Sequence, residues 1–152
     1  MNHYERTLSI RMVSCVSRYR VSLGVTTGMS MESLRWIAEK ADTIGAEGIW
    51  IGEDIGRGHD IFVMTAATLM LTRRCRVGTG IAPVATHRLF DLARAAYSLH
   101  ALAPGRFVLG LGVGGIQDLT RRGVLIRRPV TLLRESINAI RQLLLGAEVD
   151  LT

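Results

Sequence analysis

Cysteine is scarce in this chain, which has only Cys15 and Cys75 among its 152 residues. The two lie far apart and belong to no recurring spacing, so nothing indicates a disulfide framework or a cysteine-based metal motif. No apolar run reaches the roughly 18 residues of a membrane span. The first twenty residues also lack the long apolar core of a secretory signal. We therefore expect two reduced thiols in a cytoplasmic protein without a membrane partner.

Lysine and aromatic residues are also rare, although the chain is basic. The formal net charge is +6, yet Lys40 is the only lysine and aromatic residues make up 5% of the chain. The arginines form scattered doublets, with few aromatic side chains between them on which nucleic-acid bases could stack. We therefore predict no nucleic-acid partner, and we interpret some of the arginines as available for small anionic ligands.

Apolar residues are abundant, at 48% of the chain, and they fall into two alternating kinds of segment. Short apolar runs predict strands at 20–26, 48–52, 77–81 and 106–111. Apolar residues at spacings of three and four predict helices at 30–45, 61–71, 86–103 and 129–146. Ser30 and Asp60 are suited to helix N-caps and Pro129 to a first helical turn. Ile44 and Leu102 are expected to face inward.

A strand followed by a helix, repeated four times, predicts an α/β fold with a parallel sheet. The strands start near residues 21, 48, 76 and 107, which are 27, 28 and 31 residues apart. Eight such units would total about 240 residues, the usual size of a TIM (β/α)8 barrel. We therefore predict that residues 20–152 form the first four β/α units, a half-barrel, after an extension at 1–19. Its open edges would need a second copy, a complementary chain or missing sequence to cover them.

In a barrel of this kind, ligands bind at the C-terminal ends of the strands. Glycine and polar residues collect at those predicted ends, in 26–28, 52–60, 82–88 and 112–115. Glu53 and Asp54 are the candidate catalytic residues, because either carboxylate could orient a substrate or bind a ring. Neighbours on a strand point to opposite sides, so both would face one pocket only if the chain has already turned.

The alternative role for these two acids is a salt bridge at the rim, with Arg57 or Arg88 as the partner. His59 and His87 show no metal-ligand spacing to another histidine or cysteine, and no Ser-His-Asp set is evident. We therefore predict no metal site, and we interpret both histidines as loop or capping residues more readily than as catalytic bases.

Gly110, near the end of the fourth predicted strand, and Gly112 and Gly115, after it, have the spacing G-x-G-x-x-G. Three interpretations remain open. The glycines allow a flat ring or a phosphate to lie against the backbone, or they permit close packing at a strand end. A Rossmann dinucleotide fingerprint is the third, although it would be expected on a first strand.

Four stretches, taken in order, resemble the luciferase-like flavin and deazaflavin (coenzyme F420) oxidoreductases. They are AEKADTIGAEGIWIGED at 38–54, VGTGIAP at 77–83, LAPGRFVLGLGVG at 102–114 and RESINAIRQLLLG at 134–146. The third unit is supported further by THR at 86–88 and LAR at 92–94. The resemblance covers residues 21–146 and includes members similar to methylene-tetrahydromethanopterin reductase.

The resemblance implies a (β/α)8 barrel with a ring-shaped redox cofactor at the strand ends. Deazaflavin-dependent members often hold a non-prolyl cis peptide in the third strand, and the matching bond is Gly80–Ile81. The cofactor-binding residues implied by the resemblance and the glycine pattern are Thr79, Gly80, Ile81, Gly112 and Gly114. Family dimers pack through the second and third helices, which suits the apolar run at 61–71.

The expected function is therefore an F420-dependent oxidoreductase, or the N-terminal part of one, that transfers hydride between the cofactor and a carbon substrate. One alternative is a non-catalytic half-barrel, surviving as a subunit or a remnant. The other is an FMN-dependent monooxygenase of the same family.

Overall fold

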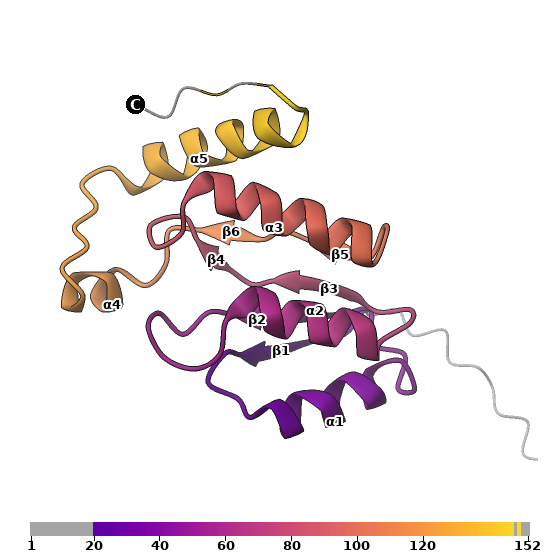
Figure 1. The fold of residues 1–152 in the computed structure, drawn as a ribbon. Coiled ribbons are helices and arrows are strands. Elements are labelled where there is room, and N and C mark those ends of the chain that lie inside the picture. Colours follow the sequence, from indigo (N-terminus) through magenta and orange to yellow (C-terminus); the bar gives the residue numbers. More distant parts are fainter. Residues whose placement is uncertain (1–19, 148, 150–152) are drawn as a thin grey trace, which may run out of the picture.

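The computed structural model describes residues 20–147 and 149, so the extension predicted at 1–19 lies outside the described residues. Segments with one or two strands alternate with helical segments along the chain (Figure 1). In order they are β1 (Ser22–Thr26), α1 (Met31–Ala41), β2 (Gly48–Gly52), α2 (Ile61–Leu71), β3 (Arg76–Thr79), β4 (Ala82–Pro83), α3 (Leu89–Leu102), β5 (Phe107–Val108), β6 (Leu111–Gly112), α4 (Ile116–Arg121) and α5 (Pro129–Leu144).

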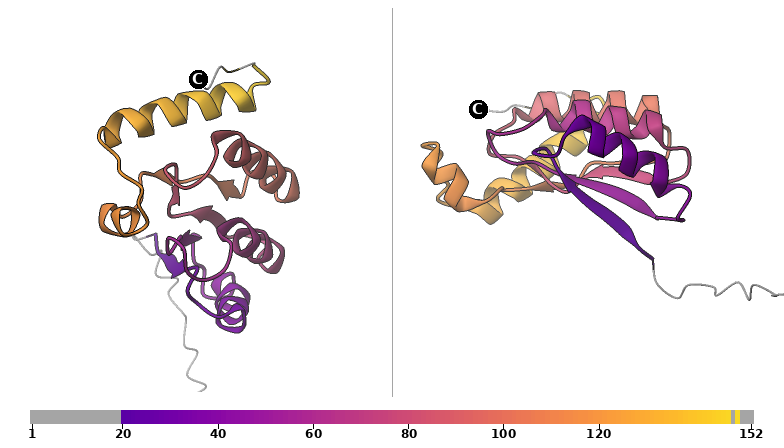
Figure 2. Two further views of the ribbon diagram at one scale, coloured as in Figure 1. Left: turned by 60° about the vertical axis from the view of Figure 1, so that its left-hand side comes forward. Right: turned by 90° about the horizontal axis from the view of Figure 1, so that it is seen from below.

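The strands form a parallel sheet in the order β1-β2-β3-β5, continued by the parallel pair β4-β6. The segments that begin near residues 48, 76 and 107 therefore lie side by side, as the sequence predicts. Helices α1, α2 and α3 cover one face of the sheet, and α5 packs beside α3 (Figure 2). This is the architecture of a partial (β/α)8 barrel, in which each crossover helix returns the chain to the same end of the sheet.

The hydrophobic core lies between the sheet and these helices. Ile49, Ile51 and Val77 are fully buried from the strands, and Leu34, Met64 and Leu92 are fully buried from the helices. Burying an aliphatic side chain of this size contributes about 1.5–3 kcal/mol. The alternating strand residues face away from the helices, toward the side that is the interior of a complete barrel.

That opposite face carries a row of four residues, one from each strand of the main sheet. Gly24, Trp50, Gly78 and Val108 are successive Cα partners across the sheet. A Cβ on Gly78 would lie 2.5 Å from Cζ3 of Trp50 and 2.7 Å from the Val108 carbonyl oxygen. The Trp50 ring therefore occupies the space that a side chain at Gly78 would need.

The third and fourth strands are each interrupted, although the sequence predicts them as continuous. The break falls at Gly80–Ile81 in the third unit and at Leu109–Gly110 in the fourth. The Thr79 hydroxyl donates to the Gly110 carbonyl oxygen at 2.7 Å and accepts from the Gly110 N–H at 2.9 Å. The Gly110 carbonyl oxygen also accepts from the Ala82 N–H at 2.9 Å, so a side chain and the backbone together join the two strands at the break, before pairing resumes between β4 and β6.

The predicted N-caps are confirmed, but two helices are shorter than predicted. Ser30 caps α1 and Asp60 caps α2 through their side-chain oxygens, and Pro129 lies in the first turn of α5. Helix α1 ends at Ala41 rather than at Gly45, and α3 begins at Leu89 rather than at Thr86. The prediction that Ile44 and Leu102 face inward is wrong, because they are 66% and 45% exposed.

Helices α2 and α3 expose large apolar side chains on the outer surface of the half-barrel. Val63 and Met70 of α2 are exposed, as are Phe90 and Tyr97 of α3. Helix α2 also buries residues on its other side, so it is apolar nearly all round. Among the residues that the structure describes, no helix combines the length and the apolar composition needed to cross a membrane.

Strand β1 is an edge of the sheet, as the half-barrel prediction requires. A groove of about 400 Å³ runs along it, lined by Leu23, Gly24, Val25, Trp36, Ile37, Lys40 and Ile44. Its walls are almost entirely apolar, and Trp36 is 63% exposed. An apolar sheet edge of this kind is normally covered by another strand and helix.

Candidate functional site

A cavity of about 420 Å³ opens at the C-terminal ends of the strands. Its lining comes from all four β/α units, as the strand-end prediction expects. The lining residues are Thr26, Gly52, Glu53, Asp54, Ile55, Gly80, Ile81, Pro83, Gly114, Gly115 and Asp118. Residues from separate strands meet here because parallel strands with crossover helices end at one edge of the sheet.

The back of the cavity is the break in the third strand. The Gly80–Ile81 peptide bond is cis, which confirms the expectation drawn from the family resemblance. The Gly80 N–H donates to the Ile51 carbonyl oxygen at 2.7 Å, so the break remains tied to β2. Gly52 lies against it, because a Cβ there would be 3.2 Å from the Gly80 carbonyl oxygen. The result is a wall made largely of backbone.

One side of the cavity depends on glycine at position 114. Gly114 has φ of +99°, a backbone conformation that residues with a side chain rarely adopt. A Cβ there would lie 2.9 Å from Cδ1 of Ile55 and 3.2 Å from Cβ of Pro83. Any larger residue would therefore narrow the cavity from the side of the β6–α4 connection.

Glu53 and Asp54 both line the cavity, although they are adjacent in sequence. Strand β2 ends at Gly52, so the alternation of a strand no longer applies to them. The Asp54 carboxylate accepts from the Gly28 N–H at 2.8 Å, and the Asp54 N–H donates to the Thr27 hydroxyl at 2.8 Å. Asp54 therefore ties the loop after β2 to the loop after β1. Thr27 is fully buried, and nothing in the sequence marks it for this role.

Glu53 pairs with His87, and the predicted partners Arg57 and Arg88 are wrong. The distance from Oε2 of Glu53 to Nε2 of His87 is 2.7 Å, and the two side chains are 16% and 20% exposed. The hydrogen bond that His87 donates to Glu53 raises the pKa of His87 above its ordinary value, although partial burial acts in the opposite direction. His87 also meets the Phe62 ring edge-on, with 5.4 Å between ring centroids.

Two of the predicted cofactor-binding residues lie behind the cavity rather than in its lining. Thr79 is buried and bonds to Gly110, and a Cβ on Gly112 would meet the Ile81 side chain at 2.9 Å. Both residues therefore support the wall that Gly80 and Ile81 form. A direct contact between either of them and a cofactor stays a prediction.

Residues 12–152 match the family described as luciferase-like monooxygenase. The chain belongs to this family. A 4-hydroxyprotoasukamycin monooxygenase of Streptomyces nodosus subsp. asukaensis is 35% identical over 83% of this chain and 35% of that protein. A 5,10-methylenetetrahydromethanopterin reductase of Methanolobus tindarius is 31% identical over 75% of this chain and 35% of that protein. The chain thus spans about a third of the length of these relatives.

Solved structures show the same fold. The coenzyme F420-dependent tetrahydromethanopterin reductase of Methanopyrus kandleri superposes with a TM-score of 0.73 over 81% of this chain and 39% of that chain, at 18% identity. The fold also excludes the Rossmann interpretation of the glycines at 110, 112 and 115. Gly110 lies in the break of the fourth strand, Gly112 lies in β6, and Gly115 lines the cavity.

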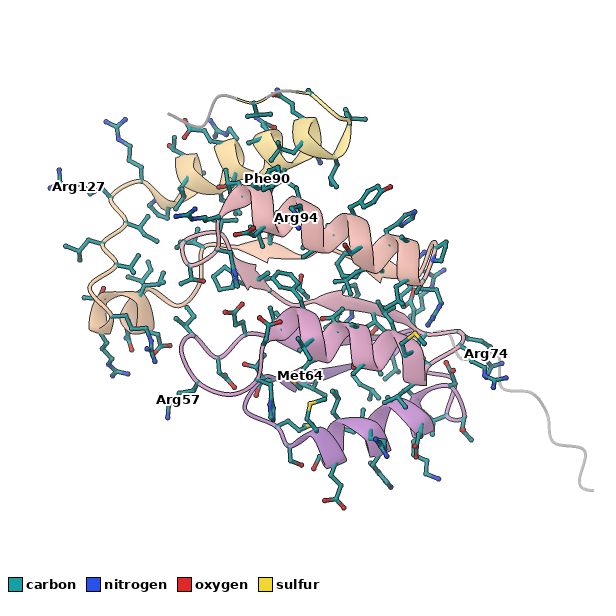
Figure 3. All side chains as sticks on the ribbon, viewed as in Figure 1. Arg57, Met64, Arg74, Phe90, Arg94 and Arg127 are labelled. Carbon is teal, nitrogen blue, oxygen red and sulfur yellow. The ribbon has the colours of Figure 1, made fainter. Side chains whose placement is uncertain are left out.

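A second hollow of about 480 Å³ adjoins the cavity at the strand ends and shares Asp54, Ile55 and Asp118 with it. Arg57 also lines it, from the loop between β2 and α2 (Figure 3). His59 is exposed and lines neither hollow, and its backbone N–H donates to the Thr27 carbonyl oxygen. Within residues 20–147 and 149, no three His, Cys, Asp or Glu side chains are grouped as a metal would require.

Proposed function

We propose that this chain forms the ring-binding half of an F420-dependent oxidoreductase that transfers hydride between the cofactor and a carbon substrate. One observation carries the proposal: the break in the third strand at Gly80 and Ile81 forms a backbone wall at the strand ends, in a cavity that the carboxylates Glu53 and Asp54 also line. Membership of the luciferase-like family and similarity to F420-dependent enzymes support it. Because the chain covers about a third of its relatives, the activity of the whole protein is part of the proposal.

The residues present fit a flat ring. Gly80, Gly114 and Gly115 leave the wall and rim without side chains, and a Cβ at Gly114 would fill space beside Ile55. Ile81 would provide an apolar surface for the ring. A deazaflavin, when bound, supplies the hydride chemistry, and the protein supplies orientation and electrostatics.

The two carboxylates are proposed to act differently at this site. Asp54 is fixed by the Gly28 N–H and by Thr27, so its role is to hold the rim and orient what lies against it. Glu53 is paired with a side chain that can gain or lose a proton, so it is the better candidate to hold or move a proton near the substrate.

FMN-dependent monooxygenation is the second candidate function. It is favoured by the relative with 35% identity, which is itself a monooxygenase. The same wall and rim would accept the ring of FMN, which has the shape of a deazaflavin. A non-catalytic half-barrel is the remaining alternative, and it predicts that neither cofactor binds.

Cofactor titration tests these proposals. The 152-residue chain, alone and with a complementary half-barrel from a full-length relative, is titrated with F420 and with FMN and followed by cofactor fluorescence. We expect saturable binding that is tighter for F420, whereas tighter binding of FMN would favour the monooxygenase. Failure of both to bind, with and without the complementary half, would contradict both enzyme proposals.

A pair of glycine variants shows whether binding occurs in this cavity. Gly114→Ala should weaken binding by about tenfold, because a misfit of about 1.4 kcal/mol or more arises against Ile55 and Pro83. Gly123→Ala is the matched control, since Gly123 also has a positive φ but has no atom within 4 Å of the position that a Cβ would take. Equal loss in both variants would show a general folding effect rather than a binding site.

We also propose that the chain associates through α2 and α3. Their outer surface exposes Val63, Met70, Phe90 and Tyr97, and Arg94 stacks on Phe90 at 5.7 Å (Figure 3). We expect sedimentation velocity to show a dimer that Met70→Glu converts toward monomer. Met31→Glu, at an exposed methionine of α1, should leave the sedimentation coefficient unchanged. A dimer insensitive to Met70→Glu would place the interface elsewhere, for example along the open edge at β1.

A further inference from the structure

Glu53 and His87 join two loops of the cavity that are 34 residues apart in sequence. Glu53 follows β2 directly, and His87 lies between β4 and α3. Glu53 lines the cavity, whereas His87 stands behind it, against the Phe62 ring of α2. The imidazole is therefore placed to act on the cavity through the carboxylate rather than by touching a ligand.

We propose that His87 is a positioning residue that holds the Glu53 carboxylate at the cavity and sets the net charge presented to the cofactor ring. The proposal rests on the proposed function, because it assigns a role within the same ring-binding site. With a protonated imidazole the pair is neutral overall. With a neutral imidazole the cavity carries an uncompensated carboxylate beside Gly80 and Ile81.

The surroundings of His87 favour the protonated form. Three acids act on it: Glu53 through the hydrogen bond, Asp60 from the N-cap of α2 and Asp91 from the first turn of α3. The neighbouring Arg88 is exposed. The hydrogen bond that His87 donates to Glu53 is the largest influence and raises the pKa of His87, partial burial lowers it, and the two other acids add to the rise. The pair therefore stays neutral overall to a higher pH than a free imidazole would allow.

The charge of the Glu53–His87 pair should affect how tightly the cavity binds the reduced cofactor. A ring that has accepted a hydride is more electron-rich than the oxidised ring, so an uncompensated carboxylate nearby disfavours the reduced form. Affinity for the reduced cofactor should therefore fall as the pH rises through the titration of His87, and affinity for the oxidised form should fall less. Asp54 cannot produce this effect, because its carboxylate accepts from the Gly28 backbone N–H and its own backbone N–H donates to the Thr27 hydroxyl, and neither partner titrates in this range.

The first arm of the test needs no cofactor. The imidazole signal of His87 in the full chain is followed by NMR between about pH 5 and about pH 9. We expect the titration midpoint of His87 to fall in Glu53→Gln, because the hydrogen bond to Glu53 raises the pKa of His87. The same midpoint in the wild-type chain and in Glu53→Gln would overturn the inference.

The second arm measures binding of reduced and oxidised FMN and F420 over the same pH range. As the pH rises over this range, we expect the affinity of the wild-type chain for the reduced forms to fall. The fall should be about three- to tenfold larger than in His87→Gln, which keeps a hydrogen-bond donor without the charge. His87→Lys keeps a charge that does not titrate in this range and should also remove the extra drop. His59→Gln should behave as wild type. The titration of the ligand itself is common to all variants and cancels in the comparison.

The outcomes separate the two proposals. Binding with the same pH dependence in wild type and His87→Gln would overturn the role of His87 and leave the proposed function standing. Failure of the wild-type chain to bind either cofactor at any pH, with a complementary half present, would overturn the proposed function and this role together. The NMR arm would then still decide whether the Glu53–His87 ion pair exists.

Discussion

Gly78→Ala is expected to lower the free energy of unfolding by about 2–3 kcal/mol, although it adds only one methyl group. Gly78 is buried in the central strand β3, between Trp50 of β2 and Val108 of β5. The new Cβ would lie 2.5 Å from the Trp50 ring and 2.7 Å from the Val108 carbonyl oxygen. Either the Trp50 indole must leave its position or strands β3 and β5 must move apart. Urea denaturation followed by far-UV circular dichroism measures the change.

Gly24→Ala is the control, because Gly24 belongs to the same row of the sheet and has no atom within 4 Å of a Cβ position. It should leave stability unchanged or raise it by a few tenths of a kcal/mol, since alanine restricts the unfolded chain. In Gly78→Ala the emission of the half-buried Trp50 should also shift. If the two variants were equally stable, the packing of Trp50 over Gly78 would be contradicted.

Asp42→Ala is expected to cost about 3 kcal/mol, because one carboxylate holds the connection between α2 and β3. Asp42 follows α1 and accepts from the backbone N–H groups of Arg73, Arg74 and Cys75. The Cys75 thiol lies beside it and donates to the Ala46 carbonyl oxygen at 3.1 Å. Glu39→Ala, which removes an exposed carboxylate from the same helix, should change stability by less than about 0.5 kcal/mol.

The contribution of Asp42 should also depend on pH. Burial raises its pKa, but the Cys75 thiol and the three backbone N–H groups outweigh burial and lower the pKa to about 2 from an ordinary 3.8. A carboxylate with a depressed pKa stabilises the fold above its unfolded value and loses this effect as the pH falls through the folded value. The stability gap between wild type and Asp42→Ala should therefore narrow by about 1–2 kcal/mol between about pH 4 and about pH 2. A gap that stays constant over this range would contradict the hydrogen-bonded carboxylate.

The place of the site could be predicted from the sequence, but its internal pairing could not. The strand ends at 26–28, 52–60, 82–88 and 112–115 do converge on the cavity, because parallel strands bring all their ends to one edge. The sequence favours Arg57 or Arg88 as the partner of Glu53, whereas the partner is His87. Arginine is the more common basic residue in this chain, so the sequence favours it as the partner. Only the geometry of the loops that follow β2 and β4 brings the His87 imidazole to Glu53.

The interruption of the third and fourth strands is a second feature that the structure shows and the sequence does not predict. The apolar runs at 77–81 and 106–111 predict continuous strands, because periodicity records side-chain polarity and not backbone pairing. The Thr79 hydroxyl bonds both the N–H and the carbonyl oxygen of Gly110, which also accepts from the Ala82 N–H, and these bonds form only once the third and fourth strands are neighbours. Thr79 consequently supports the cavity wall from behind, a position that its place in the sequence does not reveal.

The sequence by itself determined the four repeated units of strand and helix, the caps at Ser30 and Asp60, and the end of the sheet at which the cavity opens. These features follow from local propensity and from the handedness of the crossovers, which act over a few tens of residues. Only the tertiary structure decided that Trp50 covers Gly78, that Asp42 holds the start of β3 and that His87 stands behind Glu53. Such contacts depend on strand register and loop geometry, which arise when distant segments pack together. They therefore leave no periodic pattern of apolar residues in the sequence.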